Sequence, residues 1–168
     1  NGTNAPGYVD VNRQFAMSPD GKYVLDAFTV VEYDDRDNDY AVVDQGSVLG
    51  LIDVEAETWT AIVEDEYVFN PFWSADGDLI AERYVDPAAD EGSGTLIRID
   101  GDALIDGKFE YKSLGASPGR LLALSNGGDQ AAFAVTGAAC DGLDFADPAE
   151  LYVRDLATGA MHHLATPD

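Results

Sequence analysis

One pattern recurs three times along this chain and limits its fold more than any other feature. An apolar run ends in serine, a short turn rich in Asp, Asn and Gly follows, and a second apolar run begins. The copies span residues 15–22, 71–78 and 122–129, and resume with apolar runs at 23–25, 79–81 and 131–133. Asp tolerates unusual backbone conformations and Gly adopts positive φ at no steric cost, so each copy predicts a β-hairpin.

A second predicted hairpin follows each of these copies, and its first strand ends in Asp. These strand ends are Asp53, Asp100 and Asp155, which follow the serine of the repeat by 35, 26 and 30 residues. Two fixed hairpins joined by a loop of variable length indicate a unit with strands A, B, C and D. Such units, repeated about every 40–50 residues, predict the blades of a β-propeller.

The predicted fold is therefore all-β: a partial β-propeller of three four-stranded antiparallel blades in one domain. We place the blades at residues 14–69, 70–120 and 121–168. The leader, residues 1–13, contains an alternating segment and is expected to supply a clasp strand to a blade completed by another segment.

A local alternative exists near the last blade. Asp147 followed by Pro148 resembles a helix start, with an Asp cap and Pro at the first helical position. Tyr152 and Val153 favour a strand instead, and Gly159 falls where the helix would continue. Register with the other two repeats supports the strand.

The segments FAMSPDGKYVL, PFWSADGDLIA and ELYVRDLATGAMHHL resemble the repeats of TolB-type propellers, also known as PD40-like and related to WD40-like repeats. The resemblance extends over residues 15–167, and the third copy departs from it with Asn126-Gly127-Gly128 in place of Pro-Asp-Gly. It implies a propeller architecture and leaves the function open, because blades of this kind serve in many unrelated proteins.

Three blades are too few to close a ring, since propellers close with about 4–8 blades. An open stack leaves two apolar sheet faces uncovered, which is an aggregation hazard. We therefore expect the partner to be either further blades in sequence outside this chain or a second copy, with a homodimer closing a six-bladed ring.

The charge balance is extreme and excludes several classes of partner. The chain has 9 basic residues against 32 acidic ones, giving a formal net charge of −23. This field repels nucleic acid and anionic membrane surfaces, and the sequence holds no apolar run long enough to enter a membrane. Cations and basic proteins are the partners that it attracts.

Composition also bears on the setting in which the protein works. Asp outnumbers Glu, and lysine occurs only at Lys22, Lys108 and Lys112. Many Asp and few Lys resemble proteins from salt-loving organisms, where salt screens self-repulsion. The other interpretation is a cation-rich extracellular setting, and we expect an extracellular, periplasmic or cell-surface location.

Long acidic loops join strands B and C in every unit, at residues 32–40, 86–92 and 140–147. Long loops on a rigid scaffold are where binding usually resides, so they predict an acidic functional rim. Asp35, Asp37 and Asp39 alternate as in calcium loops and are our candidate calcium ligands. Tyr40 stands where a helix–loop–helix site needs Gly, so a solvated acidic loop remains the alternative.

No convincing catalytic constellation emerges, and we predict no catalytic residues and no cofactor besides calcium. Residues 115–119 match Gly-x-Ser-x-Gly, but Pro118 lacks the N–H that an oxyanion hole needs after the serine. We interpret this segment as a linker between blades. Adjacent His162 and His163 should point to opposite faces of a strand, one packed and one exposed. Cys140, the single cysteine, is expected to be a small packed residue, with an intermolecular disulfide as the alternative.

These observations favour a non-catalytic binding or scaffold module that presents an acidic loop face to a protein or cation. The alternative comes from the resemblance, because such propellers also stand beside the catalytic domain of prolyl-oligopeptidase-like serine peptidases and gate substrate entry. In that case the catalytic domain would lie outside this chain.

Overall fold

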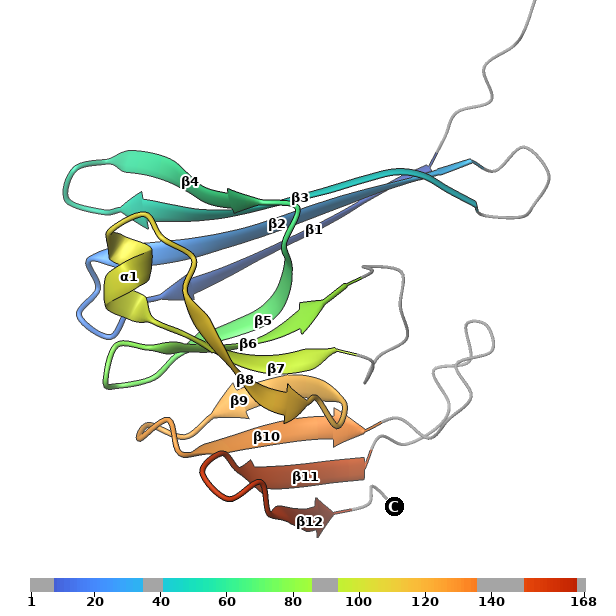
Figure 1. Ribbon diagram of the computed structural model, residues 1–168, viewed down its shortest axis with the longest axis vertical. Coiled ribbons are helices and arrows are strands. Elements are labelled where there is room, and N and C mark those ends of the chain that lie inside the picture. The colour runs from blue at the N-terminus through green and yellow to red at the C-terminus, as the bar shows by residue number, and fades with distance from the viewer. Residues whose placement is uncertain (1–7, 35–40, 86–93, 136–149, 166–168) are drawn as a thin grey trace, which may run out of the picture.

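The computed structural model describes residues 8–34, 41–85, 94–135 and 150–165 (Figure 1). Three four-stranded antiparallel sheets follow one another along the chain and stack face to face, which confirms the predicted all-β fold and its three blades. In each sheet the strands pair in chain order. We name the sheets blade 1, blade 2 and blade 3.

The strands of the three blades have these bounds. Blade 1 consists of β1 (Tyr8–Met17), β2 (Tyr23–Asp34), β3 (Ala41–Asp53) and β4 (Thr58–Glu64). Blade 2 consists of β5 (Tyr67–Trp73), β6 (Leu79–Tyr84), β7 (Thr95–Ile99) and β8 (Tyr111–Ala116). Blade 3 consists of β9 (Arg120–Leu124), β10 (Gln130–Val135), β11 (Glu150–Asp155) and β12 (Met161–Ala165). The first strands of neighbouring blades, β1, β5 and β9, contact one another.

The segment expected to be a separate clasp is part of blade 1. Residues 8–13 form the first half of β1, which pairs with β2 from Tyr8 opposite Tyr33 to Met17 opposite Val24. The hydrogen bonds of the long strand β2 are therefore satisfied within its own sheet. Blades 2 and 3 begin at Tyr67 and Arg120, a few residues from the predicted boundaries.

The region after Asp147 was the one with a helix as alternative. Residues 150–155 form β11, so the predicted strand is confirmed there. The helix that does occur was not predicted: α1 (Gly101–Ile105) occupies the turn between β7 and β8. The strand that follows it, β8, begins at Tyr111.

The three strand-end aspartates have the same role in all blades. Asp53 Oδ1 accepts the N–H of Ala56, and Asp155 Oδ1 accepts the N–H of Thr158, at 2.8 and 2.7 Å. Asp100 Oδ1 accepts an N–H at the same offset, 2.8 Å away, and thereby caps α1. Each Asp therefore satisfies a backbone donor that the turn leaves unpaired.

The serine turns are not identical in length. The N–H of Ser18 and of Ser125 bonds to the carbonyl five residues on, whereas that of Ser74 bonds to Asp78, four residues on. The position opposite the serine is therefore Tyr23 in blade 1, Asp78 in blade 2 and Gln130 in blade 3. This corrects the sequence alignment by one residue, which matters because neighbouring strand residues face opposite sides.

With that alignment every blade faces the same way around the stack. Leu25 and Leu49 of blade 1 pack against Leu79 and Ile97 of blade 2, all at most 1% exposed. The opposite face of blade 2 packs on blade 3 in the same manner. The residues there that are at most 1% exposed are Ile80, Leu96, Leu121, Ala131 and Phe133. The core therefore lies between the sheets and leaves one face of blade 1 and one face of blade 3 without a neighbouring blade.

Candidate functional site

The strand ends that lead into the predicted acidic rim are within the described residues. The ends of β2, β6 and β10, where the long loops leave the sheets, lie on the same side in Figure 1. The candidate calcium ligands Asp35, Asp37 and Asp39 lie outside the described residues, as does Cys140. Among the residues that are described, no three His, Cys, Asp or Glu side chains come together as a metal site.

Ser117 lies in the connection between β8 and β9, as expected for a linker between blades. It is 2% exposed, and its Oγ lies 2.7 Å from both Glu82 Oε1 and the carbonyl oxygen of Gly119. A buried serine whose hydroxyl is held by these two oxygens has a structural environment rather than that of an exposed nucleophile.

The two histidines stand on β12 opposite different residues of β11. His162 pairs with Val153 and His163 with Tyr152, so they face opposite sides as predicted. Both are exposed, which corrects the expectation that one would be packed. The His163 ring lies 5.0 Å from the Tyr152 ring. Their divergence makes a shared metal site unfavourable.

Sequence reasoning missed a buried carboxylate at Glu82 on β6, which is 0% exposed. Besides Ser117, it accepts the side-chain amide of Asn70 at 2.7 Å and the backbone N–H of Leu121 at 3.0 Å. These donors come from β5, the inter-blade linker and β9. Glu82 therefore connects blade 2 to the first strand of blade 3.

The same network extends to blade 1 through Asn70. Asn70 adopts the left-handed conformation with φ of 50°, which is uncommon outside Gly, at an irregularity in the pairing of β5 with β6. Gln14 of β1 accepts the Asn70 N–H, and its amide nitrogen lies 3.3 Å from Asn70 Oδ1. Polar contacts thus join the first strands of all three blades.

The uncovered face of blade 1 is an exposed apolar surface. It carries large apolar side chains on β1 and β4 that are half exposed or more. These are Val11, Phe15, Met17 and Trp59, at 50–62% exposure. Their spacing on β1 has the period of two that places side chains on one side of a strand.

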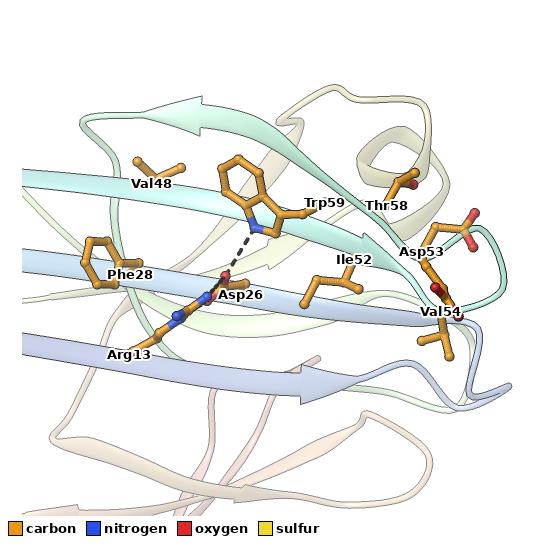
Figure 2. Close-up of a pocket in the computed structure, with 10 residues that line it drawn as sticks. Arg13, Asp26, Phe28, Val48, Ile52, Asp53, Val54, Thr58 and Trp59 are labelled. Carbon is orange, nitrogen blue, oxygen red and sulfur yellow. Dashed lines mark hydrogen bonds and ion pairs between the residues drawn. The ribbon is translucent and has the colours of Figure 1, made fainter.

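A charged cluster lies at the centre of this face (Figure 2). Arg13 donates from Nε and Nη2 to the two carboxylate oxygens of Asp26, at 2.8 and 2.7 Å. Trp59 Nε1 donates to Asp26 Oδ2 at 3.1 Å. The indole lies on Gly50, where a Cβ would come within 2.5 Å of Nε1, so this position favours Gly. We name Arg13, Asp26 and Trp59 the blade 1 triad.

Apolar side chains surround the triad and form a concavity of about 810 Å³. Phe28, Val48 and Ile52 line it, on the two central strands of the blade (Figure 2). Arg13 stacks over the Phe15 ring, 5.0 Å from its centroid, which adds a cation–π contact. The open face of blade 1 is therefore an apolar surface with one ion pair, Arg13 with Asp26, at its centre.

The triad could not be identified from sequence because its members are 13 and 33 residues from Asp26 along the chain. The available signal was an anomaly in the apolar alternation of β1 and β2, where Arg13 and Asp26 interrupt the apolar side of each strand. In a pair of adjacent antiparallel strands, opposite charges on the same side are expected to lie close together.

The triad should make stability depend on pH in a specific way. The hydrogen bonds from Arg13 lower the pKa of Asp26 from its ordinary value. A lowered pKa in the folded state contributes stability that is present above about pH 4 and is lost as the pH falls through the folded pKa. Asp26→Asn is therefore expected to be less stable than the parent near neutral pH, with a difference that shrinks on acidification.

Urea unfolding of dilute protein at a series of pH values, in high salt to suppress general charge repulsion, measures this difference. Asp102→Asn, which changes an exposed acid on α1, is the control. A destabilisation by Asp26→Asn that stays constant from neutral to strongly acidic pH would contradict the role assigned to the triad.

Solved structures of similar shape support the propeller architecture. The chain superposes on the tricorn protease with a TM-score of 0.60 at 13% sequence identity, covering 91% of this chain. It superposes on oligogalacturonate lyase in complex with manganese, with a TM-score of 0.53, 13% identity and 98% coverage. The acylaminoacyl peptidase of Pyrococcus horikoshii gives a TM-score of 0.53 at 10% identity and 96% coverage.

These likenesses establish the fold and nothing finer, because the identities are low. The chain spans 55% of the lyase, 25% of the acylaminoacyl peptidase and 18% of the tricorn protease. No family model and no curated protein matches the sequence. The described part of the chain contains no helix with the length and hydropathy of a membrane span.

Proposed function

We propose that this β-propeller module is a non-catalytic binding or scaffold unit that presents its B–C end to a basic protein or a cation. The B–C end is the side on which β2, β6 and β10 end and the long loops begin (Figure 1). The observation that carries the proposal is the common direction of the strand ends from which the three long loops leave (Figure 1). These loops together contain eleven acidic residues and one basic residue, Arg36. Acidic loops that leave a rigid frame on the same side attract counter-charged ligands and accelerate their association.

The proposal is tested by removing charge at the B–C end and measuring binding of a lysine-rich peptide by calorimetry at low salt. The triple variant Asp35→Asn, Asp37→Asn, Asp39→Asn is expected to lower affinity about tenfold, since each exposed ion pair contributes about 0.2–1 kcal/mol. Calcium alone, titrated in the same way, determines whether these residues also bind a cation, as the sequence predicts.

A matched control removes the same charge elsewhere. Glu55→Gln, Asp102→Asn and Asp106→Asn change three exposed acids in the C–D turns of blades 1 and 2. This triple variant is expected to change peptide affinity less than twofold. Equal weakening by both triples would show that only the total charge matters, and the absence of peptide binding to the parent would refute the proposal.

The second candidate function is that of a substrate-gating propeller in a serine peptidase. The observation that favours it is the shape similarity to the tricorn protease and to acylaminoacyl peptidase. The discriminating observation is the full gene. A hydrolase domain encoded next to these blades supports the peptidase, whereas further serine-turn repeats alone support the binding module.

A further inference from the structure

The uncovered face of blade 1 is equivalent to the faces that blades 2 and 3 use to pack on the preceding blade. With the serine turns aligned by their hydrogen bonds, Val24 of blade 1 corresponds to Leu79 of blade 2 and Ala131 of blade 3. Leu79 and Ala131 are 0% and 1% exposed because the preceding blade covers them. In blades 2 and 3 this face is covered by the preceding blade, whereas in blade 1 the same face is uncovered.

A contact between the inner strands shows the same equivalence. Trp73, one residue before the turn serine of blade 2, donates its indole N–H to the Ala16 carbonyl of blade 1 at 2.9 Å. The corresponding residue of blade 1 is Met17, which is 62% exposed. Met17 thus stands where an established inter-blade contact is made, with no blade in the described structure to receive it.

The open face of blade 3 is equivalent to the faces that blades 1 and 2 use to pack on the following blade. Ala132 and Val153 are paired across β10 and β11 and lie on the side away from blade 2. The equivalent pairs in the other blades are Leu25 with Leu51, and Ile80 with Arg98, and these pairs face the next blade. The open face of blade 3 therefore corresponds to the side on which a following blade packs.

The two open faces differ in the size of their side chains. Blade 3 carries small side chains at its centre, Ala132 and Ala134 on β10. Blade 1 projects large ones, among them Trp59 and Phe15. Small residues opposite large ones allow two sheets to interdigitate at the density of a protein interior.

We infer that the open face of blade 1 binds the open face of blade 3 of a second copy of this chain, and that the two reciprocal contacts close a six-bladed ring. A second copy presents the same half-surfaces that meet between blades 1 and 2 and between blades 2 and 3, so it can continue both interfaces in the same order. Blades encoded next to this chain in a longer protein would occupy the same two faces instead and leave that protein monomeric. A head-to-tail contact that closes on itself gives a finite dimer, whereas one that does not close gives filaments.

The blade 1 triad is compatible with burial in this contact. Asp26 occupies the position of Ala81 in blade 2 and Phe133 in blade 3, both 0% exposed. Its carboxylate already accepts three hydrogen bonds from Arg13 and Trp59. A partner can therefore cover the triad without leaving an unpaired charge, the outcome that makes buried charges unfavourable.

Sedimentation equilibrium of the full chain tests the inference. The expected species has twice the 17.9 kDa mass of one chain. Two copies with a net charge of −23 each repel one another, so association should strengthen between about 0.1 M and 1 M salt, as the Debye length falls from about 10 to about 3 Å. Trp59, half exposed in one chain, should shift its fluorescence to the blue on assembly.

Charge substitutions on each open face identify the surfaces. Met17→Glu on blade 1 and Ala132→Glu on blade 3 are each expected to raise the dimer dissociation constant at least tenfold. Ile105→Glu, which places the same charge on an exposed apolar site of α1, should leave it within twofold of the parent. Circular dichroism of each variant checks that the blades remain folded.

A mixture of the two variants then distinguishes pairing of blade 1 with blade 3 from pairing of blade 1 with itself. Met17→Glu retains a working blade 3 face and Ala132→Glu a working blade 1 face, so the mixture should form a one-to-one pair that neither forms alone. A monomeric parent at high salt would overturn the inference. So would growth beyond the dimer, or a dimer that survives Ala132→Glu but not Met17→Glu, which indicates blade 1 pairing with itself.

Discussion

Replacing Glu82 by alanine is expected to lower the free energy of unfolding by about 3–5 kcal/mol, because three donors, two of them buried and one half-buried, lose their shared acceptor at once. Ser117, Asn70 and the Leu121 N–H converge on this carboxylate from three separate segments. Glu82 is 0% exposed, so in the parent these donors depend on the carboxylate and not on bulk solvent. Urea unfolding followed by circular dichroism measures the change.

Two further substitutions separate the network from loss of charge alone. Glu82→Gln preserves the shape, and its amide nitrogen can face Ser117 Oγ while that hydroxyl donates to the Gly119 carbonyl, so it should cost only about 1 kcal/mol. Glu110→Ala removes an exposed acid and should stay within about 0.5 kcal/mol of the parent. A parent-like stability of Glu82→Ala would mean that the inter-blade polar contacts are dispensable.

Phe133→Ala is the second substitution with a large expected effect, a loss of about 3–5 kcal/mol. Phe133 is the largest fully buried side chain in the cluster between blades 2 and 3. Truncation removes its transfer free energy and leaves a cavity that the surrounding sheets can only partly fill. For a chain of this size the melting temperature should fall by about 2–4 °C per kcal/mol.

Phe15→Ala provides the matched control, because Phe15 is on the corresponding open face of blade 1 and is 56% exposed. In dilute monomeric protein its truncation should cost about 0.5 kcal/mol or less. Similar losses for Phe133 and Phe15 would contradict the structural distinction between a filled and an open inter-blade face. The comparison is made by thermal and urea unfolding at the same low protein concentration.

The difference between these two phenylalanines also shows why sequence alone could not locate the site. Both lie in apolar strands next to a serine turn, and their local patterns are alike. Exposure depends on whether another blade lies against the strand. Such a contact joins residues far apart along the chain, which no local pattern reports.

The sequence alone also could not show which side of each strand faces the neighbouring blade. The turn at Ser74 is one residue shorter than those at Ser18 and Ser125, and this becomes visible only in the backbone hydrogen bonds. Since side chains alternate with a period of two, a shift of one residue exchanges the two faces of a strand. The equivalence of the open and filled faces therefore emerged from the structure.

The roles of Glu82 and Asn70 in the inter-blade network also depend on contacts that the sequence does not report. A glutamate in a strand is ordinarily read as solvent-facing, and its burial here depends on donors from three other segments. Asn70 adopts φ of 50° at the Asn70-Pro71 step, a dipeptide typical of turns that lies here inside strand β5. Helix α1 was missed for a related reason, since its five residues depend on the Asp100 cap and on the burial of Leu104.

The sequence by itself determined the strands, their turns and the grouping into three four-stranded blades, because alternation, turn residues and strand-end aspartates act over a few neighbouring residues. Only the tertiary structure decided which strand faces are covered, where the buried carboxylate finds its donors, and how Arg13, Asp26 and Trp59 come together. Those features depend on contacts between residues distant in the chain, whose free energy appears only when the sheets have stacked.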